Sequence, residues 1–152
     1  MRAKKLILDY TDAFKKEEGE TGTDVERAIA RAQALLHAVD PDADVPFKSN
    51  AALPGLEPDQ DESTLFAFAL LRELRGFPPP EGATKIKADT DGLSITLTAG
   101  PLDLKMKDRY KDPTEPRALL VKAFINDRVS GKIEVKEDTS FMSLVITLKA
   151  KM

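Results

Sequence analysis

His37 is the side chain of this sequence with the clearest capacity for chemistry, because it is the only histidine. Imidazole is the side chain that ordinarily changes charge near neutral pH, so His37 is the candidate for a phosphohistidine or a neutral-pH base. At about 100° per residue it projects roughly opposite the apolar stripe of its helix. We therefore expect His37 to be exposed, and a solvated surface histidine without a chemical role is the simpler interpretation.

A second group of candidates is basic, and it lies in and just after a segment that Leu102, Leu104 and Met106 predict to be extended. Its members, which surround Tyr110, are Lys105, Lys107, Arg109 and Lys111. Alternate basic residues on one face of a strand could bind phosphates or an acidic protein surface. Interspersed aspartates dilute the charge, so a solvated face that protects a sheet edge is the simpler interpretation.

The sequence lacks the residues that other kinds of catalytic or metal site require. The sequence has no cysteine, which excludes disulfides, thiolate nucleophiles and thiolate metal ligands. The acidic stretch 40–62 fits no calcium-loop pattern, because the required glycine and terminal glutamate are missing from their positions. No Gly-x-Ser-x-Gly motif and no second histidine is present to activate a hydroxyl nucleophile. We therefore expect no metal, no cofactor and no self-contained catalytic site.

The composition is that of one globular domain. Hydrophobic residues make up 41% and charged residues 32% of the 152 positions, and the formal net charge of −3 provides no field that attracts nucleic acid or membrane. The basic start precedes only three consecutive apolar residues, whereas a signal peptide needs about 7–15. No run approaches the roughly 18 apolar residues of a membrane span. We expect a cytoplasmic protein.

The elements that position these side chains can be read from apolar periodicity. Helices are predicted over 3–17, from Thr23 to Val39 with a capping box between Thr23 and Glu26, over 62–75, and from Thr114 to Gly131. Strands are predicted near 45–47, over 85–88 and 93–98 around an Asp91-Gly92 turn, and over 132–136 and 141–149.

This order predicts an α+β fold, a two-layer sandwich of about three helices on a mixed or antiparallel sheet. The residues expected in its core are Ile29, Leu36, Phe66, Leu70, Ile95, Leu120, Phe124, Ile133 and Ile146.

The closing part of the chain resembles the ATPase domain of histidine kinases, the GHKL or Bergerat type. The similar segments are the helical run 120–125, the strand Gly131-Lys132-Ile133-Glu134-Val135 and the alternating strand 141–148. Upstream, the run 70–74 is similar to the buried helix that carries the magnesium-binding asparagine of that family. The hairpin 85–98 and Gly100-Pro101 fall where the family has two strands and an Asp-x-Gly turn. The resemblance implies residues 24–150 as the ATPase-like domain and residues 1–22 as an N-terminal helix and loop.

The residues that hold ATP in that family are missing here. The asparagine position falls on Glu73, the Asp-x-Gly aspartate falls on Thr98 and its glycine on Gly100, and the glycine-rich loop falls on 112–117. ATP needs an amide for magnesium, a carboxylate for the adenine amine and glycines that let backbone amides approach the phosphates. Proline donates no such amide. The resemblance therefore implies a degenerate, pseudo-kinase domain.

The expected function is that of a non-catalytic adaptor or regulatory domain in bacterial two-component signal transduction, with a signalling protein as its partner. Two alternatives stay open: a histidine phosphotransferase that relays phosphate through His37, and an ATP-binding anti-sigma-type serine kinase. We also expect a homodimer or partner contact through the N-terminal helix, whose narrow apolar stripe consists of Leu6, Ile7, Tyr10 and Phe14.

Overall fold

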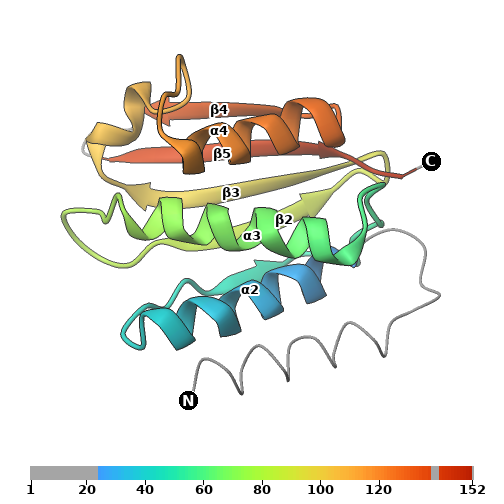
Figure 1. Ribbon diagram of the computed structural model, residues 1–152, viewed down its shortest axis with the longest axis horizontal. Helices are drawn as coiled ribbons and strands as arrows, with labels where there is room; N and C mark the ends of the chain where they lie inside the picture. The colour runs from blue at the N-terminus through green and yellow to red at the C-terminus, as the bar shows by residue number, and fades with distance from the viewer. Residues whose placement is uncertain (1–23, 138–140, 152) are drawn as a thin grey trace.

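The computed structural model describes residues 24–137 and 141–151, which form a helix layer on one face of a five-stranded sheet (Figure 1). The helices are α2 (Val25–Val39), α3 (Gln60–Arg75) and α4 (Pro116–Ala123), which continues into the π-helical turn η2 (Phe124–Arg128). The strands are β1 (Phe47–Ser49), β2 (Lys85–Thr90), β3 (Ser94–Leu102), β4 (Lys132–Glu137) and β5 (Met142–Lys149). A 3₁₀-helix, η1 (Leu104–Asp108), follows β3. The predicted two-layer α+β fold is confirmed.

The sheet is mixed. Its strand order is β1-β2-β3-β5-β4, in which β1 runs parallel to β2 and every other pair is antiparallel. The predicted β2–β3 hairpin is present, and Asp91 Oδ1 accepts hydrogen bonds from the backbone N–H groups of Leu93 at 2.9 Å and Ser94 at 2.8 Å. Gly92 has φ +90°, a conformation that favours glycine.

The starts of α2 and α3 are tied together by side chains. Asp24 caps α2 by accepting from the Arg27 N–H at 3.2 Å, so the predicted capping box that begins at Thr23 is wrong by one residue. Asp59 caps α3 and places its start at Gln60, two residues before the prediction. The Gln60 side chain bonds both the N–H and the C=O of Asp24, at 3.0 and 3.1 Å. The two helices therefore lie side by side and parallel (Figure 1).

The core lies between the helix layer and the sheet. Seven of the predicted core residues are buried, and Ile133 is half-buried. Leu120 was predicted wrongly, since 48% of its surface is exposed. The reason is that α4 turns Ala118 and Val121 towards the sheet, and a helix with apolar residues on several sides buries only the side that packs.

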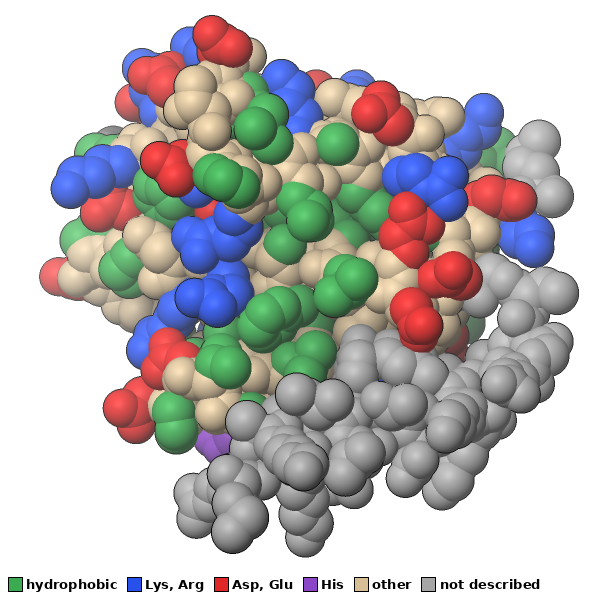
Figure 2. Space-filling model, in the orientation of Figure 1, with side chains coloured by type: hydrophobic (Ala, Val, Ile, Leu, Met, Phe, Trp, Pro, Cys, Tyr) green, Lys and Arg blue, Asp and Glu red, His purple; other side chains and the backbone are tan. Residues whose placement is uncertain are grey.

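The outer surface of the helix layer is not uniformly polar. Figure 2 shows hydrophobic side chains across its middle, with basic side chains on one flank and acidic side chains on the other. Large hydrophobic residues with high exposure on this layer include Val39, Leu65, Leu119 and Leu120. No helix within the described residues is long and apolar enough to cross a membrane.

Candidate functional site

Glu73 is the centre of the candidate site. It lies near the C-terminal end of α3, between the buried residues Leu71 and Leu74, and its own exposed fraction is 0%. An ionised carboxylate in such a place is stable only when other groups replace the water that it loses.

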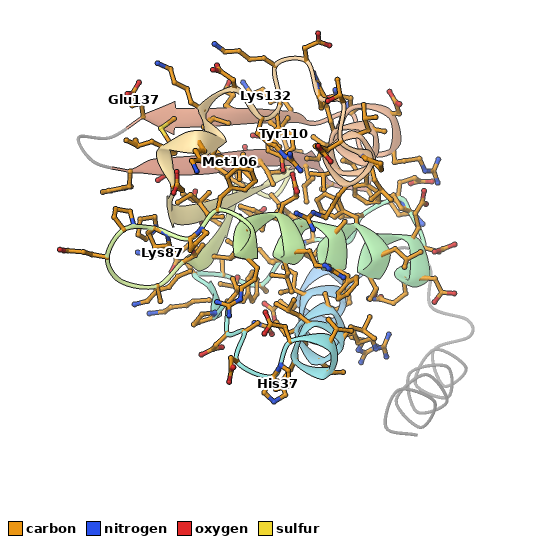
Figure 3. The ribbon with its side chains drawn as sticks, turned by 60° about the vertical axis from the view of Figure 1, so that its left-hand side comes forward. His37, Lys87, Met106, Tyr110, Lys132 and Glu137 are labelled. Atoms are coloured by element: carbon orange, nitrogen blue, oxygen red, sulfur yellow. The ribbon has the colours of Figure 1, made fainter. Side chains whose placement is uncertain are left out.

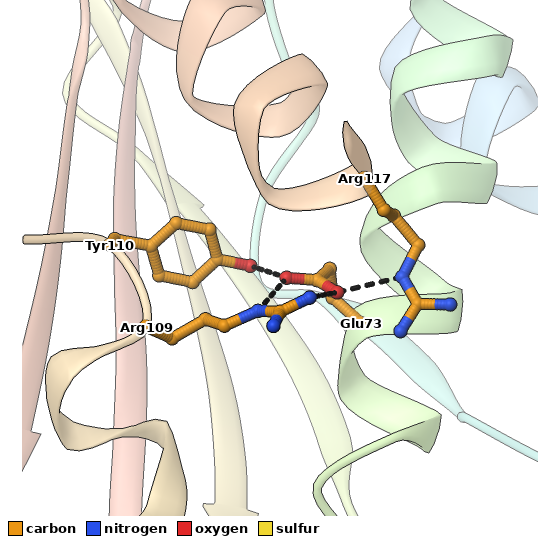
Figure 4. A network of polar contacts seen from close by, with 4 residues as sticks. All are labelled: Glu73, Arg109, Tyr110 and Arg117. Carbon is orange, nitrogen blue, oxygen red and sulfur yellow. Dashed lines mark hydrogen bonds and ion pairs between the residues drawn. The ribbon is translucent and has the colours of Figure 1, made fainter. Parts of the chain in front are cut away.

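Three side chains supply that replacement (Figure 4). Arg109 donates from Nε to Oε1 of Glu73 at 2.9 Å and from Nη2 to Oε2 at 2.8 Å, a bidentate pair. The Tyr110 hydroxyl donates to Oε1 at 2.7 Å, and Arg117 Nε donates to Oε2 at 2.7 Å. A carboxylate offers about four lone-pair sites, so these four bonds saturate Glu73.

Arg117 comes from the first turn of α4, whereas Arg109 and Tyr110 come from the segment that follows β3. Met106, buried within η1, anchors this segment to the core, and Arg109 and Tyr110 follow directly. The Arg109 guanidinium lies over the ring of Phe77, 5.2 Å from its centroid. Lys122 Nζ donates to the Tyr110 carbonyl at 2.9 Å, which connects the segment to α4. The segment therefore closes over the end of α3.

The electrostatics follow from this geometry. Burial works to raise the pKa of Glu73, but the hydrogen bonds from Arg109, Arg117 and Tyr110 outweigh it and hold that pKa below its usual value. Burial and the adjacent Glu73 carboxylate raise the pKa of the Tyr110 phenol well above its usual value. At neutral pH the site is thus an ionised carboxylate, a neutral phenol and two guanidinium ions.

The predicted extended segment around 102–107 is wrong, because Leu104–Asp108 is a 3₁₀-helix capped by Asp103, which accepts from the Lys105 N–H at 2.8 Å. Its basic residues therefore do not line one face. Arg109 turns inwards to Glu73, Lys107 lies 3.5 Å from Glu137, and Lys111 lies 3.0 Å from Asp108. Lys105 is exposed. Whether these residues contact a partner stays a prediction.

The resemblance matches two other positions, Thr98 and Gly100, to the Asp-x-Gly turn of the kinases. Thr98 of β3 is exposed and lines a hollow on the sheet face opposite the helices, whereas its neighbours Leu97 and Ala99 are buried. Since successive strand residues alternate faces, Ala99 rather than Thr98 is on the helix side. At Gly100 a Cβ atom would lie 2.8 Å from Ser143 Oγ of β5. The close approach of β5 therefore accounts for a glycine at this position.

His37 lies on the last turn of α2, exposed as predicted, and projects from the end of the molecule remote from Tyr110 (Figure 3). It is not part of the Glu73 cluster. The apolar stripe of Leu6, Ile7, Tyr10 and Phe14 falls outside the described residues.

One signal in the sequence points to the Glu73 cluster. Glu73 is the acid in a helix stretch where Leu70, Leu71 and Leu74 are apolar, and a carboxylate on a buried face requires a cation. That pattern predicts a partner but does not identify it, because Arg109 and Arg117 lie 36 and 44 positions further along the chain.

No protein-family model matches this sequence, and no match was found among curated proteins. Solved structures do match. The catalytic domain of histidine kinase ThkA superposes with a TM-score of 0.65 at 13% identity, covering 83% of this chain and 92% of that one. The Acinetobacter baumannii histidine kinase AdeS gives 0.65 at 16% identity, covering 95% and 76%.

Histidine kinase ThkA in complex with the response regulator protein TrrA gives a TM-score of 0.64 at 12% identity, and the match spans 95% of this chain but 47% of that one. The TM-scores establish a shared fold, and at identities of 12–16% the likeness extends to the fold alone. This chain has the fold of the histidine-kinase catalytic ATPase domain.

Proposed function

We propose that this chain is a non-catalytic domain of histidine-kinase ATPase fold that acts through protein contacts in signal transduction. The observation that carries the proposal is the saturated carboxylate of Glu73. The sequence resemblance matches Glu73 to the magnesium-binding asparagine of the kinases, and here its four lone-pair sites already accept hydrogen bonds from Arg109, Tyr110 and Arg117.

A bound magnesium nucleotide would have to break this cluster. A metal ligand needs a free lone pair, and freeing one on Glu73 would remove a charge-assisted hydrogen bond from a carboxylate with no solvent exposure. Breaking a buried pair of this kind costs about 3–5 kcal/mol. The cluster therefore opposes nucleotide binding energetically.

The loop at 112–117 supports the same conclusion. Pro116 is the first residue of α4, and Arg117 directly after it bonds Glu73. Proline has no N–H to donate to a phosphate, and the Glu115 carboxylate adds negative charge at the helix start, where an anion would otherwise bind.

A signalling protein of the response-regulator class is the partner that we propose, in the cytoplasm of a bacterial cell. The support is the shared fold, together with the complex between ThkA and TrrA. Lys105 and Lys111, both exposed beside the cluster, belong to the surface that we propose for this contact.

Calorimetry with MgATP tests the proposal, with an active histidine-kinase ATPase domain as the positive control. We expect no saturable heat at millimolar MgATP and no change in melting temperature. A ligand at 100 times its dissociation constant would stabilise the protein by about 2.7 kcal/mol, an effect that melting would detect. Saturable binding would refute the non-catalytic proposal and favour the ATP-binding serine-kinase alternative.

A further inference from the structure

The outward face of α3 carries a regular stripe. Its residues, at alternating spacings of four and three, are Asp61, Leu65, Phe68, Arg72 and Arg75. This is the spacing that keeps side chains on one seam of a helix facing another helix. Leu65 is 59% exposed, and Phe68 is half-buried under the Arg72 guanidinium, 5.8 Å from its ring centroid. Within the described residues, nothing packs on this seam from outside.

One end of the seam is basic. Arg72, Arg75 and Arg117 line a hollow of about 350 Å³ where the ends of α2 and α3 meet the start of α4. The acid there is Asp40, which accepts from Arg75 Nε at 2.9 Å. Arg117 reaches Glu73 through Nε, so its two terminal nitrogens remain on the side of the hollow.

The other end of the seam is acidic, as Figure 2 shows. Asp59, Asp61 and Glu62 occupy the first turn of α3 and its cap, and Arg128 pairs with Glu62 at 2.6 Å. Partial burial and the neighbouring Asp59 raise the pKa of Asp61. A cation brought near Asp61 would therefore stabilise its charged form.

We propose that the occupant of this seam is a second copy of the chain, with the two α3 helices antiparallel across a two-fold axis at Phe68. Asp61 lies seven positions before Phe68 and Arg75 seven positions after it. A two-fold axis there places Asp61 of each copy opposite Arg75 of the other. Leu65 then packs on the aliphatic part of Arg72 from the second copy, and Phe68 meets its own counterpart.

The charge pattern of the seam is self-complementary, and this favours a second copy of the chain over an acidic protein of another kind. An acidic partner would satisfy the arginine end but would repel Asp59 and Asp61, whereas an antiparallel copy satisfies both ends at once. Exposed Leu119, Leu120 and Val39 on the flanking helices extend the apolar contact.

The size of the face predicts a reversible dimer. A 16-residue helix is about 24 Å long, and α2 and α4 flank α3 at about 8–10 Å on either side, so the helix layer is roughly 20 Å wide. Its outer face therefore covers roughly 480 Å² per copy. Both copies together bury roughly 1,000 Å², at the low end of specific interfaces. We therefore expect dissociation in the micromolar range and dimers at high micromolar concentration.

Charge-reversal variants of the full chain test the arrangement by sedimentation equilibrium. Arg75→Asp and Asp61→Arg each place like charges opposite each other at both ends, so each variant alone should remain a monomer of 16.7 kDa. An equimolar mixture places opposite charges at both ends again and should form a heterodimer. Lys87→Asp, on the exposed face of β2, is the matched control and should dimerise like the unmodified chain. Circular dichroism melting establishes that each variant is folded.

Disulfide cross-linking gives an independent measurement. Because the chain has no cysteine of its own, an introduced cysteine can be oxidised only to the same cysteine of a second copy. Phe68→Cys places a thiol beside its two-fold mate and should oxidise to a covalent dimer, whereas Lys87→Cys should give only the random background. A monomeric unmodified chain at high micromolar concentration, or a variant mixture that stays monomeric, would overturn the proposal. So would a dimer that survives Arg75→Asp and dissociates on Leu6→Asp, since its interface would then involve the N-terminal segment.

Discussion

Replacing Glu73 by Gln tests the account of the buried cluster. The substitution preserves the shape of the side chain but removes its charge, and it turns one acceptor oxygen into an amide donor. That amide faces Arg109 in either orientation, together with Tyr110 at the Oε1 position or Arg117 at the Oε2 position. Arginine only donates, so at least one donor is left facing another donor. The guanidinium groups lose their counter-ion in a place where Arg109 is only 18% exposed.

The expected loss in the free energy of unfolding depends on how far the two arginine side chains are exposed. Removing one partner of a buried ion pair costs about 3–5 kcal/mol. Arg117 is 35% exposed and can recover some hydration, so the loss should lie near the lower limit, about 3 kcal/mol. With a urea m-value of about 2 kcal/mol per molar, the unfolding midpoint should fall by about 1.5 M. Far-UV circular dichroism is the suitable probe, because the chain has no tryptophan.

The effect should depend on pH in a defined direction. Because the folded pKa of Glu73 is lowered, its contribution to stability is present above its ordinary pKa of 4.5. The contribution is lost as pH falls through the folded value. The difference in unfolding free energy between the unmodified chain and Glu73→Gln should therefore be largest at neutral pH and narrow in acid below about pH 4.5.

Glu62→Gln is the matched control. Glu62 lies on the same helix and forms a bidentate pair with Arg128, at 2.6 and 2.8 Å, but that pair is solvent-exposed. Exposed pairs contribute about 0–1 kcal/mol, so the control should stay within that range. A Glu73→Gln loss no larger than the Glu62→Gln loss, or one that is independent of pH, would refute the reasoning.

Three further predictions follow from single residues. Leu70→Ala should lower the unfolding free energy by about 2–5 kcal/mol in urea, and a loss below about 1 kcal/mol would contradict the burial of Leu70. At a concentration where the chain is monomeric, Leu65→Ala on the exposed side of α3 should change it by about 0.5 kcal/mol or less. In a Tyr10→Phe variant, Tyr110 is the remaining tyrosine, and ultraviolet titration of the folded protein should detect no phenol ionisation up to about pH 11. Ionisation near pH 10, the ordinary value for a phenol, would contradict the contact between Tyr110 and Glu73. His37→Ala should leave folding intact, and incubation with phosphoryl donors should give no acid-labile phosphate on the unmodified chain; phosphate that disappears with this substitution would favour the phosphotransferase alternative.

Much of the fold could be predicted because its signals are local. The apolar period of 3.6 marks α2 and α3, the period of two marks β2, β3 and β5, and Asp91-Gly92 marks the hairpin. The errors also have local causes. Leu102, Leu104 and Met106 alternate like a strand, but the Asp103 side chain caps a 3₁₀-helix instead, and one buried residue, Met106, is enough to anchor it.

The sequence by itself determined that His37 projects away from the apolar stripe of its helix, and its resemblance to the kinases predicts that Glu73 stands at the position of their amide. Only the tertiary structure decided what Glu73 does, because its partners follow it by 36 to 44 positions and reach it through the packing of η1 and α4 on α3. The tertiary structure also left Leu65 and Leu120 in solvent, since a helix layer one helix thick buries only the side against the sheet. Periodicity specifies which sides of a helix are apolar, and packing specifies which of those sides find a partner within the chain.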